Sequence, residues 1–278
     1  MQLTRTEPAL TRGKTMKYSV FLTLIFSVLL TQACATSNLA RQTADQVFPV
    51  SEENKMGKEV AVQIEAENKV HQDPNLQAYI RGMGAKIVAA AKNDIPRGIR
   101  ITFTVVDDPK TVNAFAIPGG NIYIYTGLLK SASSEAEVAG VLGHEVAHVT
   151  RRHVAQRLLV MVGADQLIQM ASGKDPSGLA GLAGSVAAQG YFLKYSRDHE
   201  HDADDFGLDY MVRAGYNPQG FVTFFKKLGD SNVPEFLSTH PDPAGRARTA
   251  QERIREMSNT PSYTGEAEFK AKKQEFGL

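Results

Sequence analysis

The sequence has 278 residues, of which 42% are hydrophobic and 22% charged, a composition typical of a globular protein. Its 31 basic and 30 acidic residues give a formal net charge of +1, and no basic stripe is visible, which argues against a nucleic-acid partner. A single cysteine excludes an intramolecular disulfide framework.

The N-terminal segment predicts an export signal over residues 1–33. Lys14 and Lys17 supply positive charge, and the apolar run at 20–30 is shorter than the roughly 20 residues that a membrane-spanning helix needs. Cys34 then follows a small residue, as in the lipobox of bacterial lipoproteins, although Thr31 stands where leucine is usual. We expect lipidation at Cys34, with residues 34–50 as a tether to a domain of residues 51–278; a plain cleaved signal that leaves a free thiol is the alternative.

The next part of the chain predicts two helices and a small sheet. Helical patterns begin near Ser51 and at Asp73-Pro74. Alternating apolar residues predict a strand at 101–106. Two further extended pieces, 114–117 and 121–126, are separated by Pro118-Gly119-Gly120, which predicts a hairpin or a sharp bend.

From Ser133 onward the sequence predicts helices, so we expect an α+β fold that is mostly helical. Ser134 and Glu137 have the spacing of a capping box, at the start of a helix whose apolar face runs to about His153. The stretch 158–193 predicts two short helices around a loop at 172–177, because charged residues interrupt it and exclude a membrane span. Further helices are expected at about 198–214, 218–228 and 243–257.

The segment His144-Glu145-Val146-Ala147-His148 carries the strongest chemical signal. Residues four apart lie on one face of a helix, so both histidines can direct a ring nitrogen at one zinc ion. Glu145 stands beside such a metal and can act as a general base on a water molecule. A surface helix with two histidines is the alternative, but the apolar neighbours indicate a buried helix, in which His and Glu need partners.

A catalytic zinc usually takes three protein ligands, so a third should come from a later helix. The cluster Asp198-His199-Glu200-His201-Asp202 offers three candidates, of which at most one can face the metal, because successive residues point about 100° apart. Asp204 shares a face with Glu200 and can either accept a hydrogen bond from a ligating histidine or stand near the substrate. A solvated, charged helix face is the alternative.

Taken together, the motifs resemble the metallopeptidase family that includes HtpX, BepA, LoiP and the CAAX prenyl endopeptidases. The resemblance covers about residues 51–255 and rests on these segments: Asn113 to Gly120, Thr126 to Leu129, Gly143 to His148, Glu200 with Ala203-Asp204, and His240-Pro241 with Arg246. It implies a zincin-like domain that binds one zinc ion through His144, His148 and Glu200, with Glu145 as the base. The sequence predicts no transmembrane helices and no long C-terminal repeat module, which indicates the short exported lipoprotein type and argues against processing of prenylated peptides.

We therefore expect a metalloendopeptidase of the cell envelope. Residues 114–124 should supply an edge strand along which an extended substrate adds, with Asn113, Ala114, Phe115 and Ala116 in contact with it. Such binding reads the backbone, so unfolded or misassembled envelope proteins are the expected substrates. Ala35 after the cysteine favours the periplasmic face of the outer membrane.

Two other functions remain open. A zinc-bound chaperone or assembly factor for outer-membrane proteins would keep the same site with little turnover. A zinc hydrolase that acts on small substrates would have no use for an edge strand.

His240 precedes a helix expected to begin near Pro243, and on its own it resembles an ordinary loop histidine. In BepA-like relatives, however, a His-Pro loop with a following arginine lies over the zinc. The resemblance therefore implies one of two roles: His240 occupies the fourth zinc position as an autoinhibitory latch, or His240 and Arg246 stabilise the oxyanion of the reaction. We favour the latch.

Overall fold

The computed structural model describes residues 40–188, 195–230 and 234–278, and residues 41–278 belong to one structural unit. The expected signal segment and Cys34 lie outside the described residues. A short helix at 40–47 leads into α2 (Val50–Glu67) and α3 (Pro74–Ala90). The start predicted for α3 is confirmed: Asp73 is the N-cap and accepts a hydrogen bond from the backbone N–H of Asn75, with proline at the first helical position.

The sheet contains β1 (Thr102–Val106), β2 (Ala114–Ala116) and β3 (Asn121–Tyr125) in the order β1-β3-β2. The predicted hairpin is confirmed, because β2 pairs antiparallel with β3 across the 3-10 turn η1 (Pro118–Gly120), where Gly119 has a φ of 80°. β1 pairs parallel with β3. β2 is therefore an edge strand, while the outer edge of β1 is covered by residues 69–71 and by Gln77.

Side chains alternate across this sheet and divide the apolar core into two clusters. Ile122 and Ile124 of β3 belong to the cluster that includes α3, α5, α9 and α10. Tyr123 and Tyr125 belong to the other cluster, which includes α2, α6, α7 and α8. The prediction of a mostly helical α+β fold with one small sheet is confirmed.

Beyond the sheet the described chain is helical. The helices are α4 (Thr126–Ser131), α5 (Glu135–Thr150), α6 (His153–Val162), α7 (Ala164–Ala171), α8 (Pro176–Ala188), α9 (Arg197–Arg213), α10 (Gln219–Asp230), α11 (Pro234–Thr239), α12 (Pro243–Glu256) and α13 (Glu266–Glu275). Among the residues described, no helix is both long and apolar enough to cross a membrane.

One predicted helix boundary is wrong, and one break between helices was not predicted. The helix of the His-Glu-x-x-His segment ends at Thr150 instead of His153, because Arg152 adopts a left-handed conformation with φ 56°. The stretch after residue 158 also has an unpredicted break, since Gly163 with φ 83° separates α6 from α7 before the expected loop. Helices α4, α11 and α13 were not predicted.

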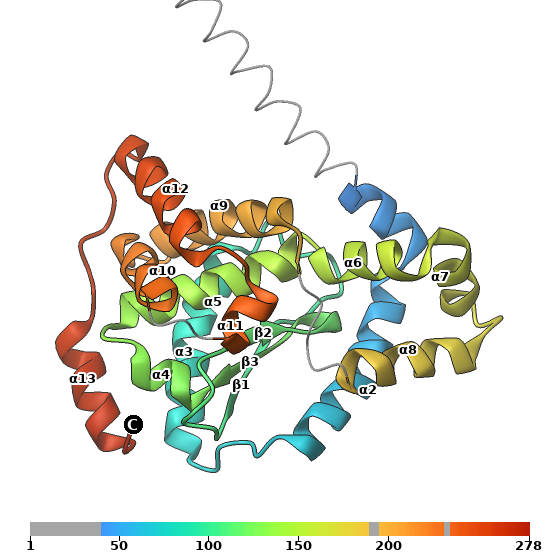
Figure 1. Cartoon of the computed structure of the whole chain (residues 1–278), viewed down its shortest axis with the longest axis horizontal. Helices are drawn as coiled ribbons and strands as arrows, with labels where there is room; N and C mark the ends of the chain where they lie inside the picture. The colour runs from blue at the N-terminus through green and yellow to red at the C-terminus, as the bar shows by residue number, and fades with distance from the viewer. Residues whose placement is uncertain (1–39, 189–194, 231–233) are drawn as a thin grey trace, which may run out of the picture. The chain divides into compact units, whose positions relative to one another are not determined.

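Helix α5 is the element that positions the rest of the domain, and every one of its residues is buried. Figure 1 shows it running between the sheet on one side and α9 and α12 on the other. Glycines allow α5 and α9 to approach closely: a Cβ atom on Gly143 would lie 2.7 Å from the carbonyl oxygen of Gly207, and one on Gly207 would lie 2.8 Å from the backbone nitrogen of His144. The two helices therefore meet at the histidine motif.

Candidate metal centre

Helix α5 begins at a cap that the sequence predicts. The Ser134 side chain accepts a hydrogen bond from the N–H of Glu137, whereas the Glu137 carboxylate accepts from the N–H of Ser133 instead of closing a complete capping box on Ser134. From this start, His144 and His148 fall on one face, and their Nε2 atoms lie 3.0 Å apart. Both side chains are fully buried, and burial holds their pKa values well below the usual range, so they remain in the neutral form that binds a metal.

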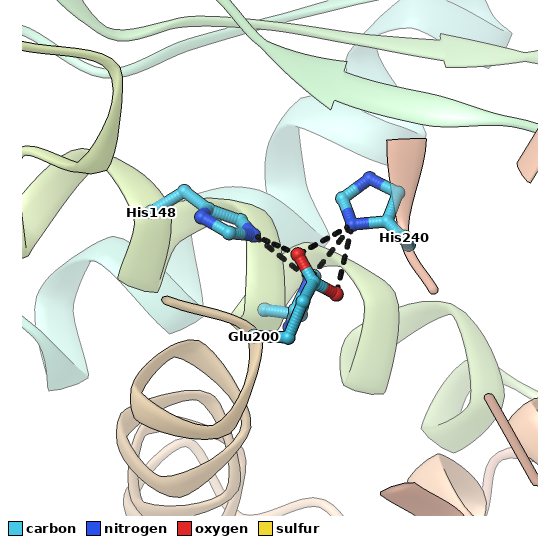
Figure 2. Close-up of side chains that lie close together, drawn as sticks. His148, Glu200 and His240 are labelled. Atoms are coloured by element: carbon cyan, nitrogen blue, oxygen red, sulfur yellow. Dashed lines mark hydrogen bonds and ion pairs between the residues drawn. The ribbon is translucent and has the colours of Figure 1, made fainter. Parts of the chain in front are cut away.

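Glu200 of α9 meets these histidines. Its Oε1 atom lies 3.4 Å from Nε2 of His148, and its Oε2 atom lies 3.6 Å from Nε2 of His144. His240, which directly follows α11, approaches from another side, with Nδ1 3.2 Å from both Glu200 oxygens and from Nε2 of His144. Figure 2 shows His148 and His240 on either side of the Glu200 carboxylate.

One nitrogen or oxygen from each of His144, His148, Glu200 and His240 lies within 4.8 Å of the others, in a buried setting. Imidazole nitrogens and a carboxylate are ligands that zinc accepts, so these donors fit a zinc ion. Nε2 of His240 and both oxygens of Glu145 are buried and have no side-chain hydrogen-bond partner in the described part of the chain; the backbone of Ala116 is the one group there that offers Glu145 a hydrogen bond, and it lowers the pKa of Glu145 only as the smallest of the named effects. Buried polar atoms with so few partners are unusual inside a protein and typical of a reaction centre.

The two rivals of Glu200 point elsewhere. His201 is exposed, and His199 stacks on His153 with ring centroids 4.5 Å apart. Neither belongs to the group of four donor residues. Ser196 caps α9 by accepting a hydrogen bond from the backbone N–H of His199, and Glu200 is the residue of this turn that faces α5.

Glu145 lies beside the four donors and is completely buried. Burial raises the pKa of Glu145 to about 7; the charge of His240 opposes this rise and the charge of Glu200 adds to it. Oε1 of Glu145 lies 3.6 Å from Nε2 of His240. A carboxyl group with such a pKa is suited to exchange a proton near neutral pH.

Asp204 and Arg246 form the outer side of the centre. Asp204 Oδ1 lies 3.0 Å from Nδ1 of His144, close enough for the acceptor role that the sequence offered as one of two possibilities, and Nη2 of Arg246 lies 3.1 Å from the same nitrogen. Arg246 of α12 contacts Asp204 through Nε at 2.7 Å and also pairs with Glu200. Although burial disfavours a charged carboxylate, Arg246 and His240 hold the pKa of Glu200 well below its usual range.

The expected substrate-contacting residues lie next to α5, but they are not open to solvent. Asn113, Ala114, Phe115 and Ala116 are all buried, the last with 7% of its surface exposed. The odd-numbered residues 113 and 117 bond to β3, so the backbone groups of Ala114 and Ala116 point away from it, toward the sheet edge. The N–H of Ala114 is already bonded to the Asn113 side chain.

Sequence reasoning missed the residues behind His148. His153 contacts it through two Nδ1 atoms at 2.9 Å, and the Tyr195 ring stacks on it at 3.8 Å between centroids. On an uninterrupted helix, a residue five positions on points about 140° away, so the local sequence held no signal for this contact.

A buried helix with a His-Glu-x-x-His pair, joined by a carboxylate from a later helix and packed beside a small sheet, defines a zincin-like metallopeptidase domain. The family model of peptidase family M48 matches residues 70–254. The chain therefore belongs to the M48 metallopeptidases, and the metalloendopeptidase class predicted from the sequence is confirmed.

Named relatives agree with this membership. The chain is 33% identical over 250 residues to the beta-barrel assembly-enhancing protease of Yersinia pestis, covering 85% of this chain and 51% of that protein. It is 32% identical over 176 residues to metalloprotease YcaL of Escherichia coli, covering 61% of this chain and 68% of YcaL. It is 36% identical over 154 residues to the mitochondrial metalloendopeptidase OMA1 of Arabidopsis thaliana, covering 54% of this chain and 31% of that protein. The chain thus spans about half the length of the assembly-enhancing protease.

Proposed function

We propose that this protein is a zinc-dependent endopeptidase of the bacterial cell envelope that cleaves unfolded or misassembled proteins. The observation that carries the proposal is the Glu145 carboxylate, buried and without a side-chain hydrogen-bond partner among the described residues, next to four convergent donor residues. Because the chain belongs to a family of metallopeptidases, we assign hydrolysis of peptide bonds to this site.

His144, His148 and Glu200 would hold the zinc ion. The ion supplies Lewis acidity, which polarises the scissile carbonyl and acidifies a water molecule. Glu145 takes the proton of the attacking water on a carboxylate oxygen and passes it to the leaving amine. Asp204 Oδ1 lies 3.0 Å from Nδ1 of His144 and would accept the Nδ1 proton when Nε2 binds the metal, so Asp204 would be a positioning residue.

Substrates would bind as an extended chain along β2. The outward carbonyl groups of Ala114 and Ala116 offer hydrogen-bond acceptors for an added strand, and helix α5 with Glu145 lies next to this strand. Recognition through the backbone gives loose sequence preference, which suits unfolded chains. Ala114 and Ala116 are buried, so the part of the protein that covers this edge must move before a substrate can pair with β2.

A zinc-bound chaperone or assembly factor with little turnover is the second candidate. It is favoured by His240, which brings a fourth protein donor to a centre whose catalytic form needs an open position. The word "assembly" in the name of the Yersinia pestis relative points the same way. Membership of the M48 peptidases argues against a zinc hydrolase of small molecules.

Localisation rests on the sequence and on the relatives. A lipid anchor at Cys34, a tether at 34–50 and a position on the periplasmic face of the outer membrane are the arrangement we propose for the full chain. The name of the Yersinia pestis relative refers to beta-barrel assembly, which supports an envelope location.

The proposed function is tested by incubating the purified protein with an unfolded substrate such as casein. We expect cleavage that a chelator stops and added Zn²⁺ restores, and no cleavage by Glu145→Gln at unchanged zinc content, because an amide fills the space but cannot accept the proton. Stoichiometric zinc without turnover of any unfolded protein would favour the chaperone. Release of the metal by Glu145→Gln would contradict its role as base.

A further inference from the structure

We propose that His153 and Asp202 are positioning residues that fix the tautomer and the orientation of His148 in the metal centre. The inference rests on the zinc site of the proposed function and extends it to two residues outside the ligand set. His148 directs Nε2 at Glu200 and His144, while its Nδ1 lies 2.9 Å from Nδ1 of His153. On the far side of that ring, Nε2 of His153 lies 3.1 Å from Oδ2 of Asp202.

The positions of the protons follow from this chain of contacts. A histidine that binds a metal through Nε2 carries its proton on Nδ1 and needs an acceptor there. Nδ1 of His153 can accept only when its own proton is on Nε2, and Asp202 accepts that proton. Oδ2 of Asp202 also accepts a hydrogen bond from Nε of Arg151 at 2.6 Å, and this bond fixes the carboxylate next to His153. In this arrangement the Nδ1 proton of His148 is accepted by His153 and the Nε2 proton of His153 is accepted by Asp202. Nε2 of His148 is then left free for the metal.

Both metal-binding histidines of α5 therefore have a carboxylate partner on α9, reached in different ways. His144 contacts Asp204 directly, whereas His148 reaches Asp202 through the His153 ring. Helix α9 thus contributes Glu200 and both outer carboxylates. A shift of α9 would disturb all three at once.

The backbone is shaped to make the His148–His153 contact. Helix α5 ends at Thr150, and Arg152 takes a left-handed conformation that is rare for a residue other than glycine. The buried Arg152 side chain holds this turn by pairing with Glu53 at 2.6 Å and with Asp45 at 2.5 Å, and by donating to the carbonyl of Phe48. The turn starts α6 at His153 and directs its ring back at His148.

The test measures zinc binding by the metal-free full chain. The dissociation constant for Zn²⁺ is determined by competition with a chelating dye, together with the visible spectrum of the Co²⁺-substituted protein and the melting temperature of the metal-free form. His153→Phe keeps a ring but loses both hydrogen bonds, and Asp202→Ala removes the terminal acceptor. We expect each to weaken Zn²⁺ binding about 10–100-fold and to change the Co²⁺ spectrum.

Two further variants separate positioning from packing. His153→Asn retains an acceptor near the Nδ1 position and should recover part of the affinity. Asp205→Ala removes another aspartate–arginine pair from α9, with Arg253, and should bind Zn²⁺ like the wild type. Wild-type affinity and an unchanged spectrum in both His153→Phe and Asp202→Ala would overturn the inference, as would an equal loss in Asp205→Ala. A wild-type chain that binds no Zn²⁺ would instead overturn the metal centre itself. If His153→Phe does not fold, Asp202→Ala decides.

Discussion

Nδ1 of His240 lies 3.2 Å from Nε2 of His144, across the centre where a zinc ion would sit. The backbone N–H of His240 is bonded to the carbonyl of Phe236 at 2.8 Å, and the Phe236 ring stacks on the imidazole. His240 is thus held by α11 beside the other three donors, at a position from which it would supply a fourth ligand. A zinc ion with four protein ligands has no open position for the reacting water.

His240→Ala should therefore raise basal proteolysis of an unfolded substrate at unchanged zinc content. Initial rates and metal analysis of the same preparation check this. If His240 instead stabilises the oxyanion, kcat should fall by roughly 10²–10³ with little change in binding. An unchanged rate of proteolysis with unchanged zinc content would show that His240 has no role in the site.

Glu200→Ala should lose most of the bound zinc, because it removes the carboxylate that contacts both His144 and His148. His199→Ala and His201→Ala are controls from the same turn and should keep stoichiometric metal; His201→Ala is the cleaner one, because His201 is exposed whereas His199 stacks on His153. Elemental analysis of proteins purified without added zinc gives the answer. Retention of zinc by Glu200→Ala together with its loss from either control would mean that the third ligand is misassigned.

Gly207→Ala should destabilise the domain, since its Cβ atom would lie 2.8 Å from the backbone nitrogen of His144. Overpacking of this kind costs about 1–3 kcal/mol, and we expect weaker zinc binding because α9 must move away from α5. Gly82→Ala is the control: nothing lies within 4 Å of its Cβ position, and alanine favours the helix there. Urea denaturation and zinc titration of both variants distinguish a tight contact from a general effect of alanine. Equal behaviour of the two would count against the glycine contact.

Arg152→Ala should lower the free energy of unfolding by about 3–5 kcal/mol, because it leaves the buried Glu53 carboxylate without its partner. Addition of Glu53→Ala should recover part of this loss. The half-exposed pair of Arg253 and Asp205 provides the comparison, and Arg253→Ala should cost no more than about 1 kcal/mol. Similar losses in the free energy of unfolding for the two arginine variants, measured by urea denaturation, would show that the buried Arg152 pair stabilises the fold no more than the half-exposed pair does.

Cys34→Ser should turn a protein that pellets with membranes into a soluble periplasmic one, with zinc content and activity retained. Fractionation of cells grown with a labelled fatty-acid precursor checks this. A variant that still pellets with membranes and still carries the label would contradict lipidation at Cys34.

Local patterns in the sequence were sufficient for the elements that carry the first part of the site. The four-residue spacing of His144 and His148 places both on one helical face whatever the rest of the chain does. Pro118-Gly119-Gly120 likewise requires a sharp turn between two extended segments, because Gly119 adopts a positive φ at no steric cost. These features depend on residues close together in the chain, so the sequence alone determined them.

The remaining residues of the site were decided by the tertiary structure. Three adjacent residues of α9 had ligand chemistry, and the meeting of Gly143 with Gly207 and the phase of the helix directed Glu200 at the histidines. His153 lies behind His148 because distant partners on α2 and the helix at 40–47 hold Arg152 in a left-handed turn. Arginine gives no local signal for such a turn, since its cost of about 1–2 kcal/mol is met by long-range ion pairs that no short stretch of sequence encodes.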